Sequence, residues 1–136
     1  KGNLLKYYIS AQLFGCLLGV MLANTFFEHS ILELSTKSRD GLNIFISEII
    51  ATFGLIFIIF STLKDGKITV AISVATYISA GYWFTSSTSF ANPAVTIART
   101  FTDSFTGINY LNTPTYILAE FIGLILAVYI LKVIYK

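Results

Sequence analysis

Four long apolar runs, nearly free of charge, constrain most strongly what this chain can fold into. Two of the runs hold no charged side chain, the run 44–63 holds Glu48, and the stretch 115–131 of the last run holds Glu120. Each run is about as long as a helix that crosses a hydrocarbon core of about 30 Å. A core helix of a soluble protein carries polar residues along one side, whereas these runs are apolar nearly all round. They therefore predict transmembrane helices at about 7–27, 44–63, 68–84 and 115–135.

The composition excludes several classes of protein. Of the 136 residues, 55% are hydrophobic and 12% are charged, against roughly 25% charged in an average soluble domain. Too few polar residues remain to cover a soluble surface, and the hydrophobicity excludes a disordered chain. The net charge of +2 is too small for a nucleic-acid-binding surface. We therefore expect the lipid bilayer as a partner and no nucleic acid.

The basic residues gather in segments that four spans would place on one side of the membrane. Six of the nine lie at the two ends of the chain or in the link 64–67. The positive-inside rule places short segments rich in Lys and Arg in the cytoplasm. We therefore expect a multi-pass protein of the cell membrane with cytoplasmic termini. Residues 28–43 and the region of Asn92 would then open to the outside.

Side chains that could support catalysis or hold a metal are few and scattered. Cys16, the single cysteine, lies in an apolar run and is expected to be a small buried hydrophobe rather than a reactive thiol. His29, the single histidine, is expected to be solvated. The sequence has no Ser–His–acid spacing, Gly-rich phosphate loop or His-x-x-x-His pattern. We expect no enzymatic activity, no cofactor and no metal site.

Asn92 and Pro93 mark the start of a helix that is too short to span the membrane. Asn is a good helix cap, and Pro fits the first turn, where its missing N–H is not needed. An apolar half-helix at about 92–102 predicts a re-entrant segment, tolerated where its non-helical part lines a cavity. The positive end of the helix, the Asn92 amide and the carbonyls of 85–91 would suit water or a polyol and disfavour cations. A plain interhelical turn at Asn-Pro is the alternative.

Two segments of the chain resemble one another. Residues 11–20 read AQLFGCLLGV and residues 119–128 read AEFIGLILAV, so Gln12 aligns with Glu120. This pattern indicates two copies of one unit, as in transport proteins whose site lies at the interface of repeats. Chance similarity between apolar helices is the alternative. Because a half-helix precedes the second copy and none precedes the first, we expect the chain to be a fragment of a longer protein.

The Asn92-Pro93-Ala94 motif, after one span and before the last, resembles the second signature of the aquaporin (major intrinsic protein) family. The segment SEIIATFG around Glu48 resembles the fourth helix of that family, and the chain resembles its third to sixth helices. The resemblance implies an all-α membrane protein, an aquaporin-like helical bundle with a re-entrant half-helix. It implies that residues 1–136 form one partial domain, the second half of the bundle. It also implies passive diffusion of small neutral solutes, in a homotetramer.

The resemblance further implies which residues form the pore. Asn92 would donate a hydrogen bond to a permeating oxygen, and three filter positions, counted from it, fall at Val95, Ala80 and Ser89. The family usually has Arg at the position of Val95, and all three side chains are small. The constriction is therefore expected to be wider and less polar than in a strict water channel, with weaker rejection of cations.

Valine after the motif, with Arg99 one turn later, resembles a bacterial subgroup found with arsenic-resistance genes. That resemblance implies that water, glycerol and metalloid hydroxides such as arsenite would pass. Arg99 has two interpretations. Its side chain could lean back toward the filter, or it could pair with Asp103 at i,i+4 in the outer vestibule.

Three polar residues within the spans are expected to give structural support: Glu48, Glu120 and Gln12. The resemblance implies that Glu48 accepts backbone N–H groups of the pore loop. An ionisable residue inside a span is costly and usually functional or bound in a network, so a direct pore role for either glutamate is the alternative. A different class of function also stays open: a non-conducting membrane scaffold or assembly subunit, or one chain of a split channel.

Overall fold

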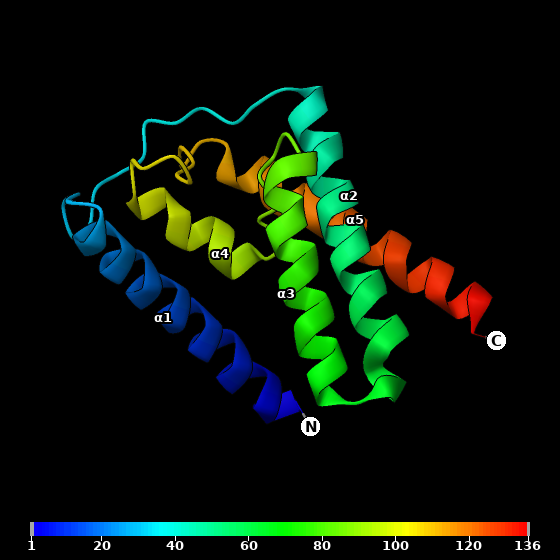
Figure 1. Cartoon of the computed structure of the whole chain (residues 1–136). Coiled ribbons are helices and arrows are strands. Elements are labelled where there is room, and N and C mark those ends of the chain that lie inside the picture. The colour runs from blue at the N-terminus through cyan, green and yellow to red at the C-terminus, as the bar shows by residue number, and fades with distance from the viewer. Residues whose placement is uncertain (1, 136) are drawn as a thin grey trace. The chain divides into compact units, whose positions relative to one another are not determined.

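The computed structural model describes residues 2–135, with side chains from Leu4 onward, and the regular structure in that range is helical throughout (Figure 1). The expected all-helical fold is confirmed. Lys1 and Lys136, two of the six basic residues behind the expected orientation, lie outside the described residues. The helices are α1 (Gly2–Phe26), α2 (Leu42–Thr62), α3 (Lys67–Phe84), α4 (Pro93–Ala98) and α5 (Thr113–Ile134), with the 3-10 turns η1 (Leu63–Asp65) and η2 (Arg99–Phe101).

Three helical segments are long and apolar enough to cross a membrane: Leu4–Phe26, Leu42–Asp65 and Thr113–Ile134. The chain is thus a multi-pass membrane protein. Helix α3, which covers the remaining expected span, has 18 residues and begins with Lys67. It is shorter than the other three and interrupted by Ser and Thr, so its crossing of the bilayer stays a prediction.

The chain divides into two compact units, which are described separately. The first comprises Lys1–Arg39 and Asn92–Pro114, and the second comprises Asp40–Ala91 and Thr115–Lys136.

In the first unit, α1 lies alongside α4 and η2 (Figure 1). The segment that follows α1 pairs with the segment around the end of the half-helix. The N–H of Ser35 donates to the Thr100 carbonyl at 2.9 Å, and the N–H of Asn109 donates to the Lys37 carbonyl at 2.7 Å. These backbone bonds connect stretches that are more than sixty residues apart in the sequence, and they hold the segment that follows the short helix.

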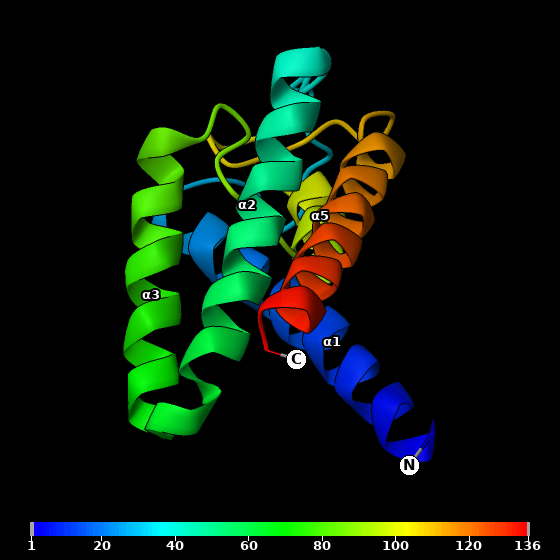
Figure 2. The same ribbon diagram turned by 90° about the vertical axis from the view of Figure 1, so that its right-hand side faces the viewer.

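In the second unit, α2 lies between α3 and α5 (Figure 2). Two glycines allow this close packing. A Cβ atom on Gly54 of α2 would overlap the hydroxyl of Tyr77 on α3, and a Cβ on Gly123 of α5 would lie 2.5 Å from the Ile49 carbonyl oxygen of α2. The Tyr77 hydroxyl donates to the Ala51 carbonyl at 3.0 Å, so the contact between α2 and α3 is also hydrogen-bonded.

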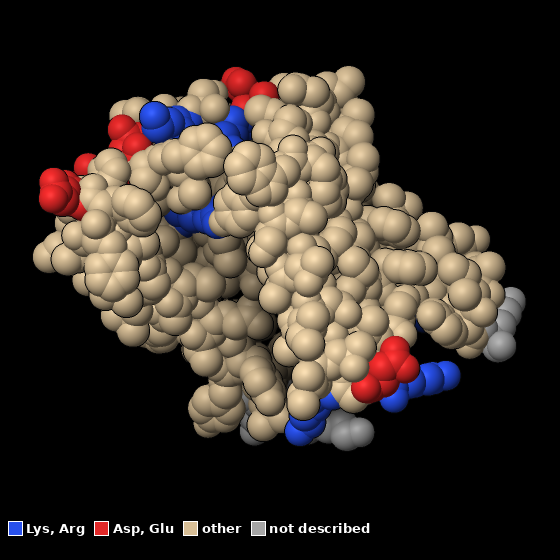
Figure 3. Space-filling view, viewed as in Figure 1, with Lys and Arg blue, Asp and Glu red and all other residues tan. Residues whose placement is uncertain are grey.

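The outer surface of this unit suits a lipid environment. The surface over α2 and α3 is uncharged down to the link at η1, where charged side chains appear (Figure 3). Large apolar side chains face outward on α3, where Ile68 is 78% exposed and Trp83 is 90% exposed. Exposed apolar surface of this extent is normal for helices that contact acyl chains, and Trp at a helix end is typical of the membrane interface.

Candidate functional site

The residues expected to form a pore are divided between the two units: Ala80 and Ser89 belong to the second, and the segment from Asn92 to Val95 belongs to the first. In the second unit, the loop 85–91 follows α3. Glu48, on α2, is completely buried, and its carboxylate accepts the N–H of Phe90 at 3.3 Å and the N–H of Ala91 at 2.5 Å. A buried carboxylate is costly unless hydrogen bonds compensate it. Glu48 therefore fastens the end of the loop to α2.

Ser47, the residue before Glu48, holds the beginning of the same loop. Its Oγ accepts the N–H of Ser86 at 2.9 Å and the N–H of Ser87 at 3.4 Å. The two middle N–H groups find acceptors within the loop, since Thr88 donates to the Thr85 carbonyl and Ser89 donates to the Ser87 hydroxyl. Every N–H of residues 86–91 thus donates to α2 or to the loop itself.

Three residues of the loop have left-handed backbone conformations without being glycine. The φ angles are +61° at Thr88, +49° at Ser89 and +51° at Ala91. Each such conformation costs of order 1–3 kcal/mol and persists only where the surroundings determine it. The hydrogen bonds to Ser47 hold the loop before this strained stretch, and those to Glu48 hold its end. They keep the three residues in these conformations.

Helix α5 holds the loop through one carbonyl. The hydroxyl of Tyr116 donates to the Ser87 carbonyl at 3.1 Å, and its ring packs against the ring of Phe90 with centroids 5.0 Å apart. Tyr116 is almost fully buried. One turn later on α5 lies Glu120, whose burial is nearly as complete.

In the other unit, Asn92 caps α4. Its Oδ1 accepts the N–H of Ala94 at 2.9 Å, and Pro93 occupies the first turn. Because Oδ1 is engaged by the cap, the amide turns its donor end away from the helix. Nδ2 then donates to Oε1 of Gln12 on α1 at 3.3 Å. Gln12 thereby orients the amide of Asn92.

The three expected filter positions differ in their surroundings. Val95 is half-buried on α4, in the same unit as Asn92. Ala80, on α3, is exposed, whereas Ser89 is buried in the loop of the same unit. A Cβ atom on Gly81 would lie 2.7 Å from the Cβ of Ser89, so Ser89 packs directly on the backbone of α3.

Asp103, the i,i+4 partner in one of the two interpretations of Arg99, is hydrogen-bonded by Thr36. The helix ends at Phe101, and Thr102 is extended, so the helical register does not reach Asp103. The Asp103 carboxylate accepts the N–H of Thr36 at 2.7 Å and the Thr36 hydroxyl at 3.0 Å. These hydrogen bonds lower the pKa of Asp103, and the bond from the backbone N–H of Thr36 has the largest effect.

The expectation that His29 is solvated is corrected, since its side chain has a partner in Glu33. Its Nδ1 lies 2.8 Å from Oε1 of Glu33, and the same oxygen accepts the N–H of Asp103 at 3.3 Å. Glu33 therefore joins the end of α1 to the segment after the half-helix.

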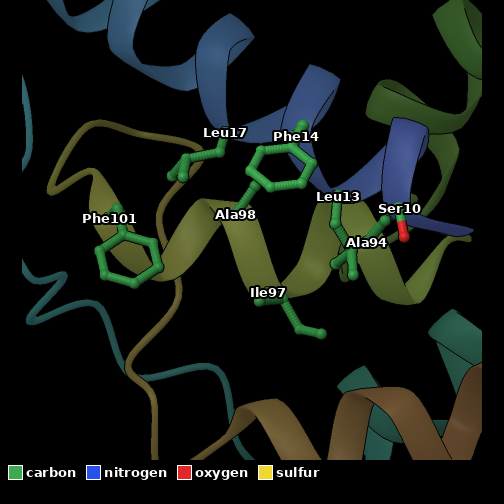
Figure 4. A pocket seen from close by; sticks show the side chains of 8 residues that line it. All are labelled: Ser10, Leu13, Phe14, Leu17, Ala94, Ile97, Ala98 and Phe101. Atoms are coloured by element: carbon green, nitrogen blue, oxygen red, sulfur yellow. The ribbon is translucent and has the colours of Figure 1, made fainter.

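A hollow of about 220 Å³ lies along the contact between α1 and α4 (Figure 4). Its lining is apolar except for the Ser10 hydroxyl, and it includes Phe14 and Leu17 from α1 and Ala98 from α4. Cys16, nearby on α1, is partly buried. Within residues 2–135, no group of three or more His, Cys, Asp or Glu side chains could hold a metal ion.

Sequence reasoning missed the roles of Ser47, Tyr116 and Gly81. A signal existed for Ser47, a polar residue beside the only glutamate of an apolar run. No local signal distinguishes Tyr116 from the other tyrosines of the chain, or Gly81 from the other small residues of the spans. Their roles depend on contacts between segments that are distant in the sequence.

Comparison with known proteins identifies a relative of this chain. The chain is 40% identical over 125 residues to aquaglyceroporin AqpS of Rhizobium meliloti (strain 1021). The match covers 92% of this chain and 54% of the relative, so the chain spans about half the length of the curated relative. No protein-family model matches the chain, and no solved structure matches it.

Proposed function

The chain belongs to the aquaporin (major intrinsic protein) family, and on this premise we propose that it forms part of a membrane channel for small neutral solutes. The solutes would be water, glycerol and metalloid hydroxides such as arsenite, moving by passive diffusion without a cofactor or chemical step. The relative's own name, aquaglyceroporin, supports a solute range wider than water alone.

The observation that carries this proposal is the hydrogen bonding of the loop 85–91. All N–H groups of residues 86–91 donate to Ser47, to Glu48 or within the loop. A non-helical backbone at membrane depth is tolerated where it is buried in protein or lines a water-filled cavity. With its donors engaged, such a loop offers carbonyl acceptors to a hydroxyl-bearing solute.

Asn92 would supply the complementary donor. Its Oδ1 is held by the Ala94 N–H, so the Nδ2 end would donate to a passing oxygen while Gln12 orients it. Neutral solutes would exchange hydrogen bonds with water for hydrogen bonds with the loop. Ions would lose hydration without a compensating charge, because residues 85–91 contain no charged side chain.

The size of the opening would follow from the small residues at the filter positions. Val95, Ala80 and Ser89 leave more room than bulky or charged side chains would. The absence of Arg at Val95 would also weaken the exclusion of cations. Arg99, at the end of the half-helix, would then be the nearest cationic side chain and would face the outer vestibule.

The remaining parts of the proposal follow from the family and from the charge pattern. The channel would be a homotetramer in the cell membrane with cytoplasmic termini. Lys64 and Lys67, at the link between α2 and α3, support this orientation by the positive-inside rule.

The test is solute flux into vesicles that contain the protein in the length encoded by its gene. Asn92→Asp removes the donor and adds a negative charge, and Val95→Phe narrows the filter. We expect Asn92→Asp to lower glycerol flux about tenfold, the equivalent of one lost hydrogen bond of about 1.4 kcal/mol. Val95→Phe should also lower glycerol flux, because the larger side chain narrows the opening. The control is Ser79→Ala, since Ser79 is exposed on α3 and bonds only within its own helix. Unchanged flux in both pore variants contradicts the proposal.

A non-conducting scaffold, or one chain of a split channel, is the second candidate. It is supported by α1, where a Cβ atom added at Gly15 or Gly19 would meet no atom within 4 Å, so another helix could approach there. Cysteine cross-linking at these glycines between separate chains, together with no flux above empty vesicles, would favour the scaffold.

A further inference from the structure

We infer that Ser47 and Tyr116 are positioning residues of the proposed channel, which together set the path of the loop 85–91 and thereby the place of Ser89. The inference rests on the proposed function, since Ser89 matters for permeation only if the protein conducts. Its structural basis is independent of conduction and can be measured separately.

Ser87 is the point at which the two residues act. Its N–H donates to Ser47 Oγ at 3.4 Å, and its carbonyl accepts the Tyr116 hydroxyl at 3.1 Å. Its own side chain accepts the N–H of Ser89 at 3.3 Å, and the whole residue is buried. The peptide groups on both sides of Ser87 are therefore oriented from α2 on one side and from α5 on the other.

Ser47 contributes more than a single bond. Its hydroxyl oxygen accepts two consecutive N–H groups, and the Ser86 side chain donates to the carbonyl of Asn43 at 3.4 Å. Asn43 lies one helical turn before Ser47, so both contacts come from one face of α2. Removing the Ser47 hydroxyl leaves two neighbouring N–H groups without this acceptor, and the one on Ser87 is buried.

The consequence for Ser89 follows from the strain in the loop. Thr88, Ser89 and Ala91 have left-handed φ angles, which non-glycine residues leave when the surroundings release them. Glu48 holds only the end of this stretch, at Phe90 and Ala91. If the hydrogen bonds from Ser47 and Tyr116 to Ser87 are lost, the backbone of Thr88 and Ser89 can relax toward ordinary conformations. The Ser89 side chain then no longer packs against Gly81.

The experiment compares Ser47→Ala and Tyr116→Phe with matched controls. Ser79→Ala removes a hydroxyl that bonds within α3, and Tyr129→Phe removes a hydroxyl from a tyrosine that is 68% exposed on α5. Ser47→Thr keeps the hydroxyl and serves as the conservative rescue. All variants are made in the protein at the length encoded by its gene.

The first measurement is the ratio of glycerol to water permeability in vesicles. We expect a change of roughly three- to tenfold in Ser47→Ala and Tyr116→Phe, the range for one or two lost hydrogen bonds. Ser47→Thr should retain most of the wild-type ratio, and both controls should stay within about twofold, well below one lost hydrogen bond. A role in folding alone lowers both permeabilities together and leaves the ratio unchanged.

The second measurement is amide hydrogen exchange of residues 86–89 in detergent micelles, which does not depend on conduction. We expect exchange to be roughly tenfold faster in the two test variants, with the helix amides of α2 unchanged. If the wild-type protein conducts nothing, faster exchange still supports the positioning role while the proposed function fails. Exchange at the wild-type rate in both variants overturns the inference, whatever the flux.

Discussion

Ser89 is seated on Gly81: a Cβ atom at Gly81 would come within 2.7 Å of both the Cβ and the Oγ of Ser89. Real Cβ atoms essentially never approach another atom so closely, so the absence of a side chain at Gly81 is what lets the loop lie against α3. Ser89 holds a left-handed φ of +49° in this place. The two residues therefore form one unit of packing, although eight positions separate them.

The first prediction concerns this packing. Gly81→Ala forces Ser89 away from α3 and is expected to change the ratio of glycerol to water permeability. Alanine is otherwise the better helix former, by about 1 kcal/mol, so the helix itself should not be weakened. The measurement is solute flux in vesicles, with thermal unfolding of the detergent-solubilised protein as a check on stability.

A second substitution makes this prediction specific. Ser89→Gly removes both atoms that the new Cβ would meet and also tolerates a left-handed backbone. Gly81→Ala combined with Ser89→Gly should therefore behave like Ser89→Gly alone, as a double-mutant cycle would reveal. Simple additivity of the two effects would show that Gly81 and Ser89 act independently.

Replacing Glu48 with Gln is expected to destabilise the second unit. Gln keeps one acceptor oxygen but places an NH₂ group against a backbone N–H, in a site that is completely buried. An unsatisfied buried donor costs about 1–3 kcal/mol, so the unfolding temperature should fall measurably. Glu28→Gln, which changes an exposed carboxylate, is the matched control. Equal unfolding temperatures for the two variants would contradict the role of Glu48 in fastening the end of the loop 85–91 to α2.

The sequence predicted those features that depend on local patterns. The apolar runs indicated the long helices, and the Asn92-Pro93 pair indicated the start of the half-helix, because capping and proline chemistry act within one turn. The path of the loop 85–91 was not predictable in this way. Its left-handed residues are Thr, Ser and Ala rather than Gly or Asn, so no turn signal marks them.

The contacts that hold this loop are non-local. Ser47 and Ser86 are 39 positions apart, and Tyr116 and Ser87 are 29 positions apart. A single sequence gives the hydrogen-bonding capacity of these side chains but not their partners. Asp103 shows the same limit, since helical spacing does not indicate its hydrogen bonds with Thr36, which lies 67 positions away in the sequence.

Close packing of α5 on α2 leads to the third prediction. A Cβ on Gly123 would lie 2.5 Å from the Ile49 carbonyl oxygen and 2.9 Å from the Thr52 Cβ, and a backbone cannot move aside as a flexible side chain can. Gly123→Ala should therefore destabilise the protein by about 1–3 kcal/mol, the usual cost of overpacking. Thermal unfolding in detergent measures this change.

Gly19→Ala supplies the control for that experiment. No atom lies within 4 Å of a Cβ built on Gly19, so alanine there adds only its helix propensity and should be neutral or slightly stabilising. If Gly19→Ala were as damaging as Gly123→Ala, the loss would reflect glycine removal in general rather than the contact with α2.

The fourth prediction concerns the contact between Thr36 and Asp103 at low pH. The N–H and hydroxyl of Thr36 hold the pKa of Asp103 below its ordinary value, which is about 3.9 for an unperturbed Asp. A carboxylate whose pKa is lower in the folded state stabilises that state above the unfolded pKa, and the stabilisation is lost as pH falls through the folded pKa. The contact between residues 35–36 and Asp103 should therefore persist at pH 5 and loosen only below about pH 4, where an unperturbed Asp would titrate. The NMR shift of the Thr36 amide proton follows this titration directly.

Thr36→Val tests the contribution of the hydroxyl, since it removes the hydroxyl but keeps the N–H. It should move the titration midpoint of Asp103 part of the way back toward the ordinary value. Thr25→Val is the control, because the Thr25 hydroxyl bonds within α1, and it should leave the midpoint unchanged. A midpoint at or above the ordinary value in the unmodified protein would mean that Thr36 does not hold Asp103 in solution.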